Sequence, residues 1–161
     1  MLRGMVTIRP ARPEDCALLL AFVRELAEYE EQPEEVLATE ADFLRDGFGA
    51  RPRFEAVIAD WDGQPAGFAL WFYNYSTWTG RHGLYLEDLF VRPAHRGRGL
   101  GKALLVHLAR LAVEQGCARY QWQVLDWNTP SIAFYEALGA RKLPEWITMR
   151  VEGSALVALA S

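Results

Sequence analysis

In FVRPAHRGRGLGKALLVHLARLA, residues 90–112, a group of arginines and glycines runs directly into an apolar helical pattern. Glycine weakens a helix by about 1 kcal/mol relative to alanine, so three glycines between residues 97 and 101 indicate a turn with a bare backbone. Backbone N–H groups of such a turn, at the start of a helix, form an anion site. The stretch therefore predicts a phosphate group held at a helix N-terminus.

The two familiar phosphate motifs do not fit this stretch. A P-loop ends in Gly-Lys-Ser/Thr, whereas Lys102 is followed by Ala103. A dinucleotide fingerprint has GxGxxG spacing, whereas the glycines here follow GxGxG. A flexible turn with solvated arginines is the alternative interpretation of the turn taken alone.

Predicted strands and helices alternate along the rest of the chain. Strand patterns occupy residues 6–11, 53–76 (two strands around the turn DWDG), 83–93, 118–126 and 145–153. Helical patterns occupy residues 12–31, 39–49, the segment from the glycines to Gly116, and 129–140. Thr39 and Thr129 are the expected N-caps of two of these helices, and Gly47 is the expected end of the first of them. The pattern predicts an α/β fold with a mixed sheet flanked by helices.

Length and composition limit the classes of protein. The chain has 161 residues and a formal net charge of −4, which fits one domain over residues 1–161 and a small cationic partner better than nucleic acid. Cys16 and Cys117 have no metal-ligand spacing and are expected to be free thiols in a reducing cytoplasm. The three histidines have no partner spacing either, so no metal is expected. We see no secretory signal and no membrane span.

The glycine turn and the segments around it resemble the GNAT acetyltransferase superfamily. Arg96-x-x-Gly99-x-Gly101 matches that family's acetyl-CoA pyrophosphate loop, and WNTPSIAFYEALGA, residues 127–140, is similar to its second signature. LYLED, residues 84–88, with ELAEYE and GFALWFYNYSTW, looks like the diamine acetyltransferase branch. The resemblance implies a GNAT-like fold, in which acetyl-CoA lies between two splayed central strands of a mixed sheet.

The resemblance also implies a set of cofactor-binding residues. Backbone amides of the turn would hold the pyrophosphate, and the strand before it would polarise the thioester carbonyl and hold the pantetheine arm. The expected set is Leu89, Phe90, Val91, Arg96, Gly97, Arg98, Gly99, Leu100, Gly101, Lys102, Asn128, Ser131 and Tyr135.

Acetyl transfer to an amine needs a neutral amine and a protonated leaving thiolate. An alkylammonium with a pKa near 10.4 is neutral only about once in a thousand molecules at pH 7.4, so a base is required. Glu87 matches the family position proposed for the base, and Tyr135 matches the tyrosine proposed as the acid. Strand alternation would place Tyr85, Glu87 and Leu89 on one face and Asp88 with Phe90 on the other. An exposed acidic pair and a core tyrosine are the structural alternatives.

Substrate recognition is predicted from carboxylates and aromatic faces, which attract cationic amines. Glu30 and Trp78 match positions that line the family's polyamine channel, and Glu87 and Asp88 are expected to bind the substrate as well. The acidic run 28–35 can equally be a solvated face. Ser76 stands where the polyamine enzymes carry a carboxylate, which favours a short diamine or lysine-like substrate over spermidine. A homodimer is expected from the resemblance.

Two other functions are compatible with the sequence. One is an acetyltransferase that acts on a protein lysine or N-terminus, and the other is a non-catalytic acyl-CoA sensor. A nucleotide-binding module is a more distant alternative.

Overall fold

The computed structural model describes residues 4–161, which divide into two compact units with the sequence boundary between Gln123 and Val124. The strands are β1 (Val6–Pro10), β2 (Glu55–Trp61), β3 (Gln64–Ser76), β4 (Arg81–Val91) and β5 (Tyr120–Gln121). The α-helices are α1 (Cys16–Tyr29), α2 (Glu40–Phe48), α3 (Leu100–Glu114), α4 (Thr129–Ala137) and α5 (Gly153–Leu159). Short 3-10 turns cover Pro13–Asp15, Pro33–Glu35 and Pro93–His95.

The first unit is built on a five-stranded sheet in the order β1-β2-β3-β4-β5. The first four strands are antiparallel neighbours, whereas β5 runs parallel to β4 and pairs with it only at Leu84 and Tyr85. Among residues 4–161, the part of β4 beyond Tyr85 has no strand partner on its β5 side. The predicted mixed sheet is therefore confirmed, and its two last strands share only a short ladder.

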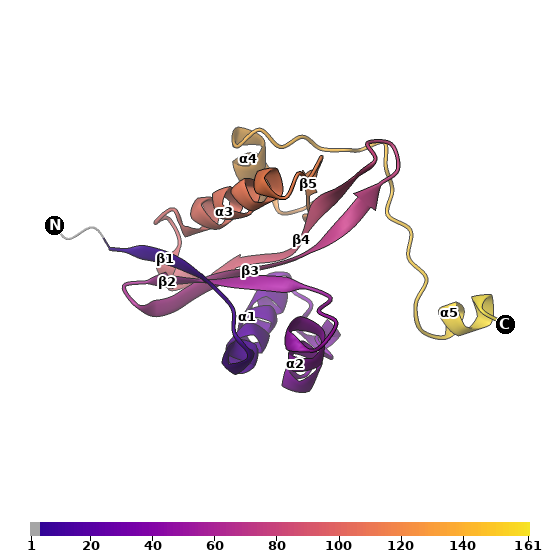
Figure 1. Ribbon diagram of the computed structural model, residues 1–161, viewed down its shortest axis with the longest axis horizontal. Coiled ribbons are helices and arrows are strands. Elements are labelled where there is room, and N and C mark those ends of the chain that lie inside the picture. Colours follow the sequence, from indigo (N-terminus) through magenta and orange to yellow (C-terminus); the bar gives the residue numbers. More distant parts are fainter. Residues whose placement is uncertain (1–3) are drawn as a thin grey trace. The chain divides into compact units, whose positions relative to one another are not determined.

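Helices cover both faces of this sheet: α1 and α2 lie on one face and α3 on the other (Figure 1). Under α1, Leu19 and Phe22 pack against Ile58, Phe68 and other side chains of the sheet. The Phe22 and Phe68 rings stack with centroids 5.3 Å apart. Buried apolar side chains on both faces hold the three layers together.

Turn chemistry fixes the strand register of the hairpin between β2 and β3. Asp62 and Gly63 both have positive φ, 49° and 78°, as a two-residue hairpin turn with right-handed strand twist requires. The Asp62 side chain also accepts a hydrogen bond of 2.8 Å from the Met5 backbone N–H, which ties this turn to the start of β1.

The helix caps agree with the sequence only in part. Thr39 caps α2 as predicted, because its hydroxyl accepts from the Asp42 N–H at 3.3 Å. The expected end at Gly47 is wrong, since α2 continues to Phe48 with Gly49 as the C-cap. A Cβ on Gly47 would lie 2.6 Å from the Phe54 ring. Position 47 therefore requires glycine because of the close packing of Phe54, and not because the helix ends there.

The second unit, residues 124–161, contains α4 and α5. Asn128, not Thr129, caps α4, because its side chain accepts the Ser131 N–H at 3.4 Å. The helix ends at Ala137 with Leu138 as the C-cap. Gly139 follows with a φ of 98°, and the Ala140 N–H donates to the Tyr135 carbonyl, as in a Schellman motif.

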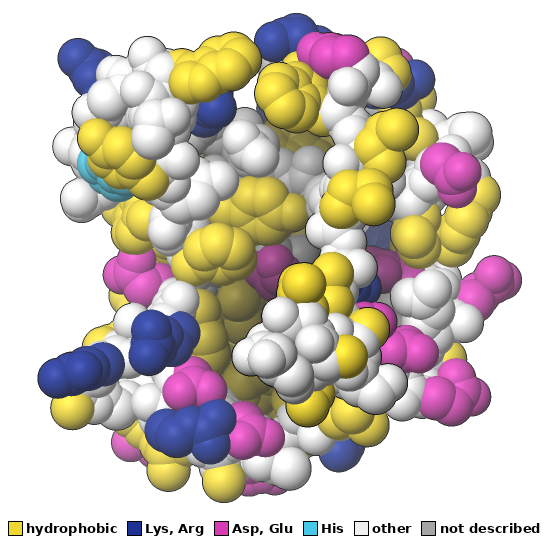
Figure 2. Space-filling view, turned by 90° about the vertical axis from the view of Figure 1, so that its right-hand side faces the viewer, with side chains coloured by type: hydrophobic (Ala, Val, Ile, Leu, Met, Phe, Trp, Pro, Cys, Tyr) yellow, Lys and Arg dark blue, Asp and Glu magenta, His cyan; other side chains and the backbone are white. Residues whose placement is uncertain are grey.

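The strand predicted over residues 145–153 is absent, because a strand requires a hydrogen-bonded neighbour and these residues pair with none. Several apolar side chains of this unit are exposed, namely Trp146, Ile147, Met149, Val157 and Leu159. Figure 2 shows hydrophobic side chains on the molecular surface, interspersed with acidic and basic ones.

Candidate functional site

The turn before α3 presents backbone donors to one side. Gly97 and Gly99 have φ values of 74° and 84°, which only glycine adopts without strain. Apart from the adjacent residues and the backbone of α3 itself, no heavy atom of residues 4–161 lies within 4 Å of the position of a Cβ on Gly97, Gly99 or Gly101. Within the described residues, the backbone N–H groups from Gly97 to Lys102 find no acceptor. This bare set of donors at a helix N-terminus fits a diphosphate.

The arginines of the turn have their side chains on neighbouring aromatic rings. The Arg98 guanidinium lies 4.8 Å from the centre of the Trp61 ring in β2. Arg96 donates from Nε to the Val91 carbonyl at 2.9 Å, and its guanidinium lies 4.8 Å from the Tyr29 ring at the end of α1. The Arg96 N–H is also bonded, to the Pro93 carbonyl. The amide donors of the turn are therefore those that follow Arg96.

The end of β4 offers further backbone donors beside the turn. The Arg92 N–H points to β3, where it reaches the Ala66 carbonyl at 2.8 Å. Because backbone polar groups alternate along a strand, those of Leu89 and Val91 point away from β3, to the side that β5 does not cover. Phe90 differs, since its side chain is buried in the cluster under α1.

A β-bulge in β4 places the acidic pair. Leu70 pairs with Asp88 and Trp71 pairs with Leu86, so Glu87 is the extra residue. The bulge corrects the predicted alternation. Tyr85, which pairs with Phe72, now shares the α1 face of the sheet with Asp88, and Glu87 is exposed between them.

Asp88 has the most perturbed carboxyl group among these residues. Burial and the charges of Glu87 and Glu30 raise its pKa to about 7. Its side chain is half-buried and finds no hydrogen-bond donor or cation among the described residues. A carboxyl group with a pKa near neutrality is suited to proton transfer at physiological pH.

Glu30 and Tyr85 border the same acids. Glu30 is the C-cap residue of α1, and burial raises its pKa. Burial and then the charge of Glu87 raise the pKa of the Tyr85 phenol. The structure thus brings Glu30, Glu87 and Asp88 into one electrostatic group. Sequence reasoning missed Tyr85 as a member, because the bulge that moves it to this face has no signal in the alternation of residues.

Ser76 and Trp78 lie at the opposite end of β4. Ser76 pairs with Arg81, seven residue steps before Asp88, which corresponds to about 20 Å along the strand. Ser76 is buried, and its hydroxyl accepts the Thr79 N–H at 3.3 Å in the hairpin turn. Trp78 is 81% exposed. Within the first unit these two residues are not brought to the acids.

The remaining predicted residues belong to the second unit. Asn128 and Ser131 form the N-terminal cap of α4 described above. Tyr135 lies one turn further along the same helix and is half-buried, with its ring 5.6 Å from that of Phe134.

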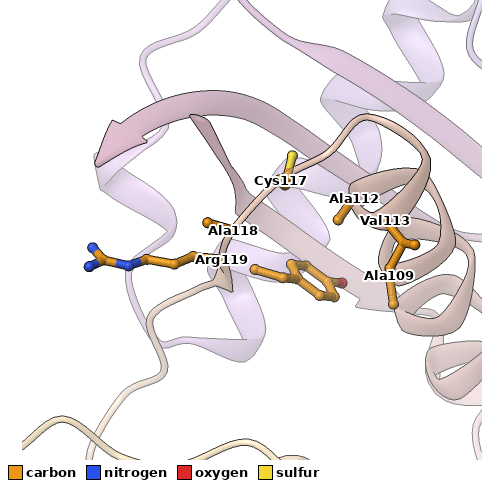
Figure 3. A pocket seen from close by; sticks show the side chains of 7 residues that line it. Ala109, Ala112, Val113, Cys117, Ala118 and Arg119 are labelled. Atoms are coloured by element: carbon orange, nitrogen blue, oxygen red, sulfur yellow. The ribbon is translucent and has the colours of Figure 1, made fainter. Parts of the chain in front are cut away.

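Two shallow hollows flank α3. One, of about 220 Å³, lies by the C-terminal half of the helix and is lined mainly by small apolar side chains and Tyr120, while the Arg119 side chain points away (Figure 3). The other, of about 490 Å³, lies between α3 and β1 and includes Gly99, Lys102 and Arg110. The first is remote from the glycine turn, whereas the second begins at it.

No group of three or more His, Cys, Asp or Glu side chains in residues 4–161 is arranged to hold a metal ion. No helix there is long and apolar enough to cross a bilayer.

Comparison with known proteins gives matches over most of the chain. The acetyltransferase (GNAT) family model matches residues 19–140. The thialysine N-epsilon-acetyltransferase of Sus scrofa is 40% identical over 166 residues, covering 96% of this chain and 97% of that protein. The L-ornithine N5-acetyltransferase of Arabidopsis thaliana is 45% identical over 94 residues, covering 58% of this chain and 41% of that protein. A solved integron cassette protein of Vibrio cholerae superimposes with a TM-score of 0.81 at 28% identity, covering 98% and 99% of the two chains.

The chain belongs to the GNAT family of acetyltransferases. The expected fold is thereby confirmed, and so is the expected enzyme class. Enzymes of this family take the acetyl group from acetyl-CoA, which agrees with the diphosphate-sized set of donors at the start of α3.

Proposed function

We propose that this enzyme transfers an acetyl group from acetyl-CoA to the primary amine of a small cationic substrate of the lysine or diamine type. The observation that carries the proposal is the group Glu30, Glu87 and Asp88, whose charges repel one another, while Asp88 finds no cation among the described residues. An ammonium group would relieve this repulsion. The names of the thialysine and ornithine enzymes, both acting on amines of amino acids, support the same class.

Acetyl-CoA would be held mainly by main-chain groups. The N–H groups from Gly97 to Lys102 would bind the pyrophosphate, and the helix dipole of α3 would add positive potential there. The backbone of Leu89 and Val91 would bind the pantetheine arm along the uncovered side of β4. Asn128, Ser131 and Tyr135 are proposed to complete the site because they match the second signature of the family.

In the reaction, the substrate ammonium first loses one proton and becomes a neutral amine. A bond then forms between the amine nitrogen and the acetyl carbonyl carbon, and the carbon–sulfur bond breaks. The nitrogen loses a second proton as the amide forms and the departing sulfur gains one, so one proton is released overall. Asp88 is the better placed proton acceptor by its pKa of about 7, and Glu87 beside it is the residue that the family resemblance assigns to this role. We assign both to removing the ammonium proton, directly or through water. Tyr135 is proposed to give a proton to the departing sulfur.

The proposal favours a short substrate. Ser76 supplies no carboxylate where the polyamine enzymes carry one, and its hydroxyl is engaged in the hairpin turn. Because Ser76 lies about 20 Å from Asp88 along the strand, the preference for a short amine rests on the resemblance and on the names of the thialysine and ornithine enzymes.

The proposal includes the domain organisation, the oligomeric state and the cellular compartment. Residues 1–161 would form one acetyltransferase domain, because the family match runs across the boundary between the two units. We further propose a homodimer in the cytoplasm. The homodimer is proposed from the resemblance to the diamine acetyltransferase branch.

A panel of amines tests the proposal. Purified protein is incubated with acetyl-CoA and with thialysine, lysine, ornithine, putrescine, spermidine or a lysine-containing peptide, and released thiol is measured. We expect thialysine, lysine or ornithine to give the highest kcat/KM. Turnover confined to the peptide would replace the proposal with a protein acetyltransferase, and CoA binding without any turnover would replace it with a sensor.

A further inference from the structure

One arginine of the glycine turn reaches the helix that carries a proposed amine-binding residue. Arg96 donates from Nε to the Val91 carbonyl at 2.9 Å, which attaches it to the end of β4. Its guanidinium carbon lies 4.8 Å from the centre of the Tyr29 ring and 5.6 Å from that of Phe90. These distances are those of cation–π contacts. Arg96 therefore connects the turn with the last residue of α1.

The contact on Tyr29 acts at a defined point of the amine site. Tyr29 is the last residue of α1, and Glu30 follows it as the C-cap. The Glu30 N–H donates to the Leu26 carbonyl at 2.9 Å, so its backbone position follows that of the last helical turn. A shift of the Tyr29 ring would move Glu30, whose charge acts on Asp88.

A second arginine explains why this coupling is confined to the end of the helix. Arg92 forms a bidentate ion pair with Glu25, at 2.8 and 3.0 Å, and lies over the Phe22 ring at 4.6 Å. This ion pair holds the body of α1 against the end of β4. Arg96 contacts α1 one helical turn later, at Tyr29, which is the last residue of the helix.

We infer that Arg96 is a positioning residue that couples occupation of the pyrophosphate turn to the placement of Glu30, so that acetyl-CoA and the amine strengthen each other's binding. This inference rests on the proposed function. Both ends of the link are on adjacent elements of the first unit: the turn that would hold the pyrophosphate, and the helix end that would hold the ammonium. Reciprocity follows from thermodynamic linkage, because each ligand changes the other's affinity by the same factor.

Arg98 provides a matched control. It lies in the same turn, carries the same charge and also stacks on an aromatic ring, but that ring is Trp61 of β2, which is not part of the proposed amine site. Removing either guanidinium takes one positive charge from the pyrophosphate turn. Only removal of Arg96 breaks the contact with α1.

The experiment measures the dissociation constant of CoA by calorimetry, with and without saturating thialysine, and the KM values for thialysine and acetyl-CoA. We expect saturating thialysine to lower the dissociation constant of CoA about two- to fivefold in the unmodified enzyme. This ratio of the two dissociation constants is the coupling factor, and its size corresponds to the free energy of an exposed cation–π contact. Arg96→Leu should lower this factor to one and raise the KM for thialysine by the same two- to fivefold. Arg98→Leu should weaken CoA binding but keep the factor.

Tyr29 gives a second route to the same result. Tyr29→Leu should abolish the factor without removing any charge, whereas Tyr29→Phe keeps the ring and should preserve it. Arg96→Lys keeps the charge but not the planar stack or the Nε donor, so it should not restore the factor. In the double variant Arg96→Leu/Tyr29→Leu the losses should not add.

The outcomes separate the inference from the proposed function. Equal effects of Arg96→Leu and Arg98→Leu on the factor, or a factor of one in the unmodified enzyme that still acetylates thialysine, would overturn the inference alone. An enzyme that binds CoA and acetylates none of the small amines would overturn the proposed function.

Discussion

Replacing Asp88 by asparagine should stabilise the folded protein at alkaline pH while reducing its activity. The carboxyl group of Asp88 is half-buried and lies beside Glu87 and Glu30, with no donor or cation of the described chain near enough to pair with it. Ionising it in the folded state is therefore unfavourable. The asparagine side chain has nearly the same shape and carries no charge.

The size of the effect follows from the pKa. The value of about 7 in the folded protein compares with 3.8 for an unperturbed aspartate. A difference of about three pKa units corresponds to a ceiling of about 4 kcal/mol, at about 1.4 kcal/mol per unit. Because Asp88 retains some access to solvent and titrates together with two other acids, we expect about half of this.

The sign of the pH dependence of the free energy of unfolding depends on whether the folded or the unfolded protein keeps the proton of Asp88. Between about pH 4 and pH 7 the folded protein keeps a proton on Asp88 that the unfolded chain has lost, so the free energy of unfolding falls as the pH rises. Above pH 7 the full penalty is present and constant. The advantage of Asp88→Asn over the unmodified protein should therefore grow by about 1–2 kcal/mol from pH 5 to pH 8 and then level off.

Urea unfolding at pH 5, 6, 7 and 8 measures this advantage, with Glu114→Gln in α3 as the control for an exposed acid that does not act on Asp88. Equal differences between the Asp88→Asn and unmodified proteins at all four pH values would refute the assignment of a near-neutral pKa to Asp88. In the same preparations, kcat/KM for thialysine should fall at least about tenfold in Asp88→Asn, the lower range of general-base effects.

Three further outcomes are expected. Gly99→Asp should abolish the increase in melting temperature that CoA gives the unmodified protein, since it adds bulk and negative charge to the turn, whereas Gly99→Ala at φ 84° should mainly lower the basal melting temperature. Tyr135→Phe should reduce turnover about 100-fold or more while CoA still binds, and unchanged turnover would make Tyr135 a packing residue. Glu31 has φ 62° at the end of α1, so Glu31→Gly should raise the free energy of unfolding by about 0.5–1 kcal/mol in urea titrations, and Glu31→Ala should give no such gain.

The parts of the fold that the sequence predicted are those with local signals. Thr39 and Asp62-Gly63 specify their own backbone geometry, and apolar side chains repeat with the period of the helix or strand that contains them. The predicted strand at residues 118–126 shortened to Tyr120–Gln121, because its length depends on how far β4 stays within hydrogen-bonding distance. Such pairing is not encoded in the strand's own residues.

In the candidate site, too, features with a local sequence signal were predictable and features that depend on strand pairing were not. The glycine turn was predictable because positive φ and bare backbone demand glycine. The placement of Asp88 with Tyr85 was not, since a bulge at Glu87 shifts the register by one residue and reverses every face assignment before it. The resemblance placed Arg96 and Arg98 among the cofactor-binding residues, and their guanidinium groups lie on aromatic rings that no local pattern links to them.

The cost of Asp88 to stability and its proposed use have one physical origin. An unpaired, partly desolvated carboxylate beside two other acids destabilises the folded protein, and natural chains remove such groups unless they are needed. The same environment raises the pKa of Asp88 to about 7, which brings it closer to that of an alkylammonium and makes proton transfer from the substrate less unfavourable. The substrate ammonium also provides the cation that the described site lacks. Binding of this ammonium stabilises the ionised form of Asp88 and so makes Asp88 a weaker base for the ammonium proton. A bound ammonium lowers the pKa of Asp88, and transfer of its proton restores the neutral acid and releases a neutral, nucleophilic amine beside the thioester.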